Sequence, residues 1–247
     1  MEDRTQEYSQ MNFTLPHDVV TLPSGGTFYK NKKGSIKVGY LTASDENILL
    51  AGGQDMTLNL LRAKIFEPGF RPEELLEGDV EAILIFLRNT SFGPEIEITS
   101  VDPKTGNSFK SVVMLDEMNI KKGQLPLEDG TFEVELPISK SKIKLKPLNY
   151  GELNELNRQI QAYPTGRIAP RKTLRLQKEI VKIDSSSDKG EIAKFVESMP
   201  IADSKFISKF MNDNEPRLDM SRVIIAPSGE KLTVNVGFGV EFFRPFF

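Results

Sequence analysis

The 247-residue sequence contains no cysteine and a single histidine, His17. Without cysteine the chain can form no disulfide, no zinc ribbon and no thiol nucleophile. Exported proteins of this size often carry disulfides, so the absence of cysteine favours a reducing cytosol. A catalytic triad or a histidine-rich metal site would have to be built on His17 alone. Its Pro-His-Asp context is typical of a surface turn instead.

Long apolar runs and a strong net charge are absent as well. The longest apolar runs, such as residues 82–87, are far shorter than the roughly 20 residues of a membrane helix. The first twelve residues are polar and acidic, which predicts no signal peptide. The net charge of −3 provides no general attraction for nucleic acid or for an anionic membrane. We expect a soluble cytosolic protein that does not bind membranes.

No motif for catalysis or for phosphate binding is present. The glycine pairs at 25–26 and 52–53 lack the Gly-Lys-Ser/Thr sequence that completes a phosphate-binding loop. Glu95 and Glu97 share one face of a predicted strand, but their alternation with isoleucine is typical of a solvated face. We identify no catalytic, cofactor-binding or metal-binding residue, and we expect a binding protein rather than an enzyme.

The hydrophobic periodicity alternates between the patterns of strands and helices. Period-two patterns predict small antiparallel sheets or hairpins at 35–42, 95–115, 131–147 and 221–240. Apolar residues at helical spacing, including Ile83, Leu84 and Leu87, predict two helical blocks, at 44–90 and 150–214. Thr42 or Ser44 can cap the first helix, which we expect to end near Gly52-Gly53, and Asp79 can cap a later one. Another helix is expected over 172–183. We therefore predict an α+β fold in which small sheets pack with two helical blocks.

Turns and composition shifts divide the chain into five consecutive segments. They are an N-terminal tail (1–20), a turn, strand and helices (21–92), a β-hairpin region (93–149), a helical region (150–215), and a C-terminal β-hairpin with an aromatic tail (216–247).

Aromatic side chains are concentrated at the end of the sequence. The candidates for partner binding there are Phe242, Phe243, Arg244, Pro245, Phe246 and Phe247. Burying each phenylalanine contributes roughly 2–3 kcal/mol, so this end is costly to leave in water. Docking onto the chain's own core is favoured, and anchoring in a partner stays open.

Two further segments are candidates for binding. Phe28 and Tyr29 follow a Pro-Ser-Gly-Gly turn, and we include both among the partner-binding candidates. The basic segment from Arg167 to Arg175 is a possible phosphate-binding patch, although it lacks interleaved aromatics. A solvated loop and helix start is the favoured interpretation of this segment.

Several of these motifs, taken together, resemble the baseplate hub assembly proteins of T4-like contractile-tailed phages. The resemblance includes Leu-Pro-Ser-Gly-Gly-Thr-Phe-Tyr at 22–29, Tyr-Leu-Thr-Ala-Ser-Asp-Glu-Asn-Ile-Leu at 40–49, the Leu-Glu-Gly-Asp step at 76–79, the strand at 132–136 and the aromatic-aromatic-Arg-Pro ending. It implies a cofactor-free, non-catalytic chaperone that binds other hub and tail proteins in the infected host cell. A permanent structural subunit of the virion baseplate is the alternative. A nucleic-acid-binding protein that uses Arg167–Arg175 is the second alternative.

One departure from this family concerns a metal site. Many relatives carry a Cys-Pro-x-Cys-Gly zinc knuckle where this chain reads Asp102-Pro103-Lys104-Thr105-Gly106. The sequence at 226–229, Ala-Pro-Ser-Gly, resembles a second such turn without ligands. The resemblance therefore implies degenerate zinc-ribbon-like turns that have lost the metal. We expect packing and backbone hydrogen bonds to hold their strands instead.

Overall fold

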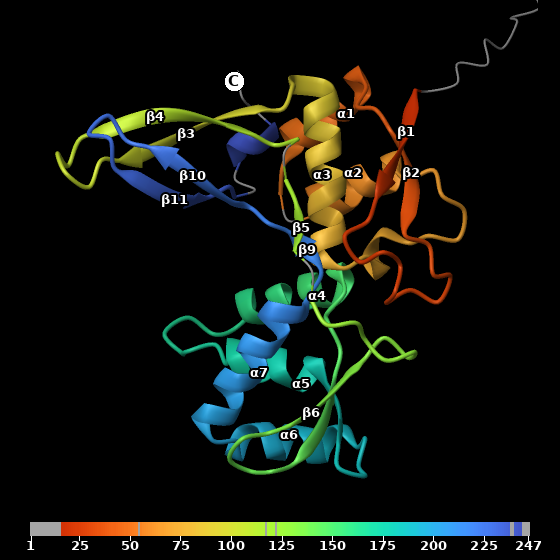
Figure 1. The fold of residues 1–247 in the computed structure, drawn as a ribbon. Helices are drawn as coiled ribbons and strands as arrows, with labels where there is room; N and C mark the ends of the chain where they lie inside the picture. The colour runs from red at the N-terminus through yellow and green to blue at the C-terminus, as the bar shows by residue number, and fades with distance from the viewer. Residues whose placement is uncertain (1–15, 54, 117, 122, 238–239, 244–247) are drawn as a thin grey trace, which may run out of the picture.

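The computed structural model describes residues 16–243 except 54, 117, 122, 238 and 239. The chain forms two bodies, which lie one above the other in Figure 1. The first body combines residues 16–121 with residues 217–243, and the second body consists of residues 123–214. Helices and small antiparallel sheets occur in both bodies, which confirms the predicted α+β fold.

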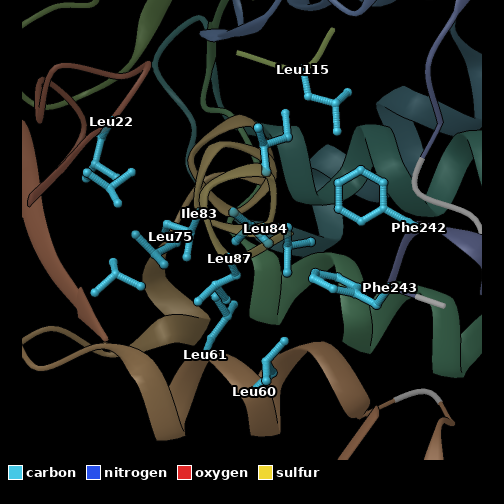
Figure 2. Close-up of a cluster of buried hydrophobic side chains, with 14 of the residues drawn as sticks. Leu22, Leu60, Leu61, Leu75, Ile83, Leu84, Leu87, Leu115, Phe242 and Phe243 are labelled. Carbon is cyan, nitrogen blue, oxygen red and sulfur yellow. The ribbon is translucent and has the colours of Figure 1, made fainter. Parts of the chain in front are cut away.

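The first body is built around α3, the longest of the described helices. Its elements are β1 (His17–Thr21), β2 (Ser35–Gly39), α1 (Ala43–Ala51), α2 (Met56–Lys64), η1 (Pro72–Glu74), α3 (Glu77–Phe92), β3 (Glu95–Val101), β4 (Ser108–Met114), β10 (Ser221–Ile225), β11 (Lys231–Asn235) and η2 (Val240–Phe243). Ile83, Leu84 and Leu87 of α3 lie at the centre of its core (Figure 2). Leucines from other elements surround them, and the sequence periodicity had predicted this buried helix.

Helix α1 begins and ends where the sequence predicted. Thr42 precedes its first residue, and the backbone N–H of Thr42 donates to the Asp45 carboxylate at 2.6 Å. Gly52 follows its last residue with a φ of 61°, a conformation that glycine adopts without strain. Asp45 also forms an ion pair with Lys64 of α2, and both side chains are buried. The pair fixes α1 to α2.

Two hairpins, β3–β4 and β10–β11, extend together from the first body and form the feature that we call the arm (Figure 1). Their inward side chains belong to the same apolar cluster as α3. These residues are Ile96, Ile98, Phe109, Val113, Ile224, Leu232 and Val234. The alternation of polar and apolar residues in β3 and β11 predicted one inward and one exposed face, as observed.

The second body is inserted into the first. The chain leaves through β5 (Ile120–Lys121) and returns through β9 (Arg217–Leu218), and these two short strands pair antiparallel. We call this pair the neck. Gly123 passes so close to the returning chain that a β-carbon on it would lie 2.6 Å from the Asn214 Cα. The exit and the return of the inserted segment therefore lie side by side.

A three-stranded sheet and four helices form the second body. Its elements are β6 (Phe132–Glu135), β7 (Lys142–Leu145), α4 (Tyr150–Gln161), α5 (Arg171–Glu179), β8 (Ile180–Ile183), α6 (Lys189–Ser198) and α7 (Ile201–Asn214). The strand order is β6-β7-β8, and all pairs are antiparallel. Its main core includes Phe132, Leu145, Leu176, Ile192 and Ile207. A smaller cluster lies between α4 and α5.

Four sequence-based expectations need correction. Residues 17–20, assigned to the tail, belong to β1, which pairs with β2. The helix expected over 172–183 ends at Glu179, because residues 180–183 pair with β7 as the strand β8. Asp79 caps no helix, since α3 already begins at Glu77. The five consecutive segments also do not follow the cores, because the C-terminal hairpin returns to the first body.

Candidate partner-binding surfaces

The N-terminal aromatic pair lies in a turn that is tied to the start of α3. Asp79, fully buried, accepts the backbone N–H of Ser24 at 2.9 Å and the hydroxyl of Tyr29. The Tyr29 hydroxyl in turn accepts the N–H of Leu76 at 2.9 Å. Burial raises the pKa of Asp79, against the opposing effect of the bonds from Ser24 and Tyr29. Burial and the neighbouring Asp79 likewise raise the pKa of Tyr29.

This arrangement assigns different surroundings to the two aromatic candidates. Tyr29 is 8% exposed and has the edge of Phe70 at a ring distance of 5.3 Å, so it could reach a partner only by leaving this site. Phe28 is half-buried, and its ring lies 5.9 Å from that of Phe132 in the second body. A cavity of about 400 Å³ adjoins both residues. Of the pair, Phe28 retains some accessible surface, beside the contact between the two bodies.

The C-terminal aromatics that the structure describes dock onto their own chain. Phe242 and Phe243 are 2% and 6% exposed, and their rings meet edge to face at 5.0 Å (Figure 2). The guanidinium of Arg88 lies 5.7 Å from the Phe242 ring centroid, within cation–π range. Intramolecular docking, the favoured expectation, therefore holds for these two candidates. Arg244, Pro245, Phe246 and Phe247 lie outside the described residues.

The two predicted knuckle turns meet at the tip of the arm. Asp102 is buried, and its carboxylate accepts the backbone N–H of Ser228 at 3.0 Å and the Ser228 hydroxyl at 2.7 Å. The backbone N–H of Lys104 donates to the same carboxylate at 2.9 Å. Burial opposes the ionisation of Asp102, but these hydrogen bonds are stronger and lower its pKa.

Backbone hydrogen bonds pair the strands of each hairpin and their inward apolar side chains pack together, as expected. The bonds from Ser228 to the Asp102 side chain are an addition that was not predicted. Among the described residues, no group of three or more His, Cys, Asp or Glu side chains is placed to hold a metal ion. An aspartate therefore occupies the position of a knuckle ligand and joins the two turns directly through hydrogen bonds.

The positively charged side chains of the basic segment 167–175 differ in their contacts. Arg175 forms ion pairs with Glu179 at 2.6 Å and with Glu215 at 3.7 Å. Lys172 donates to the Ser208 hydroxyl. Arg167 and Arg171 remain on the surface. The segment is therefore not a continuous row of available cations, which weakens the nucleic-acid hypothesis.

Apolar side chains on the surface are the feature that sequence reasoning missed. On the outer face of the arm, Val223 and Ile225 are 64% and 66% exposed. Other exposed apolar side chains lie in the loops and at one helix start of the second body, at Leu125, Ile138, Ile168 and Ile201. Their sequence signal is weak, because an isolated apolar residue in a loop looks the same whether it is buried or exposed.

The helices of the described chain include none with the length and apolar character that a bilayer crossing requires.

A comparison with protein families identifies the relatives of this chain. A family model described as "T4 bacteriophage base plate protein" matches residues 16–241. The match spans most of the sequence, and the chain belongs to this family of phage baseplate proteins. Membership associates it with the virion baseplate and with other baseplate proteins as interaction partners. No curated protein and no solved structure gives a significant match.

Proposed function

We propose that this chain is a baseplate hub assembly protein. It binds hub components in the cytoplasm of the infected host cell, without catalysis, and helps them to assemble into the centre of the baseplate. The observation that carries the proposal is the family match over residues 16–241. The motifs at 22–29, 40–49 and 76–79, which resemble those of hub assembly proteins, narrow the role from the baseplate to its hub.

The use of the buried carboxylates supports a binding role rather than an enzymatic one. Asp79 and Asp102 accept hydrogen bonds from distant backbone segments, and Asp203 accepts the N–H groups of Ile138 and Ser139. Each carboxylate therefore has a role in holding the fold. Exposed apolar side chains on the arm and in the second body give the chain surface for protein contacts.

Mass spectrometry of purified phage particles and of infected-cell lysates tests this proposal. An assembly factor is abundant in the lysate and absent from the particle. A constant copy number in the particle, in an integer ratio to known hub proteins, would make the chain a structural subunit instead. Deleting its gene provides the functional test. We expect unassembled hub proteins to accumulate, and normal hub assembly without the chain would contradict either role.

A further inference from the structure

The loop that joins α4 to α5, residues 163–170, presents an apolar side chain between two arginines. Ile168 is 95% exposed, a larger exposed fraction than that of any other large apolar side chain described here. Arg167 precedes it and Arg171 begins α5, and both lie on the surface. Tyr163, at the start of the loop, is 38% exposed. We call this segment, together with Arg171, the α4–α5 loop.

Hydrogen bonds within the α4–α5 loop fix its shape. The N–H of Arg167 donates to the Pro164 carbonyl at 3.1 Å, and Gly166 within this turn has a φ of +84°. A positive φ at the third position of a four-residue turn is typical of a type II turn. At the base of the loop, Ala169 packs against the small core between α4 and α5. The loop thus holds Ile168 outward from an anchored base.

The two arginines differ from the other arginines of the described chain. Arg62, Arg71, Arg158, Arg175 and Arg217 form ion pairs, and Arg88 and Arg222 donate to backbone carbonyls. Within the same part of the chain, Arg167 and Arg171 form neither an ion pair nor a side-chain hydrogen bond. Their guanidinium groups can therefore bind carboxylates of another molecule.

The position of Arg171 adds to the positive potential. It is the first residue of α5, Lys172 follows it, and the first turn of this helix has no acidic residue. The N-terminal end of a helix carries a partial positive charge, so cations there are disfavoured unless an anion lies nearby. An acidic group from another molecule would relieve this repulsion and could form bidentate bonds with arginine.

We propose that the α4–α5 loop docks onto another baseplate protein, at an acidic surface that contains a small apolar pocket. Ile168 enters the pocket, and Arg167 and Arg171 pair with carboxylates at its rim. Arginine and tyrosine are common anchor residues of interfaces, and a fixed loop loses little entropy on binding. This inference rests on the proposed function and names the chemistry of the partner surface.

A protein surface fits these side chains better than nucleic acid does. Nucleic-acid affinity grows with the number of phosphates neutralised. Only Arg167 and Arg171 of this segment are available, because Arg175 forms ion pairs and Lys172 donates to Ser208 within the chain. A phosphate backbone also offers nothing to an exposed isoleucine. The combination of one apolar anchor and two flanking cations therefore favours an acidic protein surface.

Binding measurements with the full chain test the inference. The probes are the purified hub proteins of the same phage, each tested alone, together with a generic DNA duplex and anionic lipid vesicles. Ile168→Asp and the double change Arg167→Glu/Arg171→Glu should each raise the Kd for one hub protein by at least about tenfold. The Kd of the unmodified chain should rise with salt, because the arginine contacts are electrostatic. Val19→Asp is the matched control, since Val19 is 63% exposed in β1, outside this loop, the arm and the second body.

The outcomes separate failure of this inference from failure of the proposed function. If a hub protein binds the unmodified chain and every loop variant alike, the loop is not the docking element, while the hub role stands. If no hub protein binds the unmodified chain, both proposals are overturned. Binding to the duplex or to the vesicles that the loop variants abolish would assign the arginines to a different class of partner. Matching thermal melts of all variants exclude unfolding as the cause.

Discussion

Buried aspartates join segments of this chain that are far apart in sequence. Asp79, Asp102 and Asp203 are at most 1% exposed, and each accepts backbone N–H groups from another segment. The donors are Ser24, Ser228, and the pair Ile138 and Ser139, respectively. A buried carboxylate is costly unless hydrogen bonds compensate for lost water. Each aspartate therefore favours the one arrangement that supplies its donors.

Removing the hydroxyl of Tyr29, which also donates to Asp79, should destabilise the first body. Tyr29→Phe deletes the hydroxyl that donates to Asp79 and accepts the Leu76 N–H, and leaves both groups buried with fewer partners. We expect the free energy of unfolding to fall by about 1–3 kcal/mol, as measured by chemical denaturation at pH 7. Tyr163→Phe is the control, because Tyr163 is 38% exposed. Equal stability of the two variants would contradict this role for Tyr29.

Glu81, which lies where α3 meets the neck, makes the folding stability depend on pH. Burial raises its pKa from 4.5 to about 7, and the nearby Glu77 and Glu215 add to the increase while Arg217 opposes it. The folded chain therefore binds a proton that the unfolded chain releases between pH 4.5 and about 7. Over this interval the unfolded state holds fewer protons, so the contribution of Glu81 to stability decreases as the pH rises.

The variant Glu81→Gln should remove this pH dependence, because glutamine stays neutral. We expect it to be more stable than the unmodified chain at pH 8, by on the order of 1–3 kcal/mol, and to differ much less at pH 5. Thermal melts at the two pH values measure this difference. Glu133→Gln on the exposed face of β6 controls for the loss of a surface charge. A gain of equal size at both pH values would contradict the assignment to Glu81.

At the scale of elements, the contact between α3 and the neck depends on a glycine. A β-carbon on Gly78 would lie 2.7 Å from the Arg217 Cα and would also overlap the Pro216 backbone. Alanine normally stabilises a helix relative to glycine by about 1 kcal/mol. Here the neighbouring atoms belong to the backbone and cannot rotate away, so the overlap should outweigh that gain.

We therefore expect Gly78→Ala to destabilise the protein by about 1–3 kcal/mol. Gly190→Ala is the matched control, because Gly190 is also in the first turn of a helix and its β-carbon would approach only the Asp188 side chain. Chemical denaturation of both variants measures the difference. A Gly78→Ala variant as stable as the control would show that the neck can move away from α3.

Prediction of elements from sequence succeeded where local signals decide the structure. The centre of α3 followed from the spacing of Ile83, Leu84 and Leu87, and the end of α1 followed from Gly52. The strand β8 was assigned to a helix because Ile180 and Ile183 continue the apolar pattern of α5. Their strand conformation depends on pairing with β7, and nothing in the local sequence identifies that partner strand.

At the scale of the whole molecule, two separate cores suggest two units of stability. Among the residues that the structure describes, the core around α3 and the core of the second body share only the half-buried Phe28 at their margins. The bodies also touch where the Tyr150 N–H donates to the Leu75 carbonyl at 2.7 Å. Local unfolding free energies can differ between units that have separate cores.

A substitution in each of the two cores should change the hydrogen-exchange protection of different backbone amides. Ile207→Ala creates a cavity in the core of the second body and Ile83→Ala creates one in the core of the first, at a cost of about 2–5 kcal/mol each. We expect the first change to weaken hydrogen-exchange protection in α5–α7 more than in α3, and the second change to do the reverse. Uniform loss of protection after either substitution would instead mean a single cooperative unit.

The candidate surfaces were harder to predict than the fold. The sequence singled out Tyr29, Phe242 and Phe243 because large aromatics are costly in water, yet the same property places them in the core. The pairing of Asp102 with Ser228 joins residues 126 positions apart, which single-sequence patterns do not reveal. The exposure of Ile168 depends on the direction of one turn and likewise could not be predicted from the sequence.

The insertion of the second body has a consequence for folding during synthesis. Phe242 and Phe243 belong to the core around α3, but a ribosome makes them after the whole second body. At about 5–20 residues per second, the second body is complete while the first still lacks β10, β11 and η2. The inserted body can therefore fold before the body that contains it. The apolar face of α3 becomes fully covered only after η2 has left the ribosome.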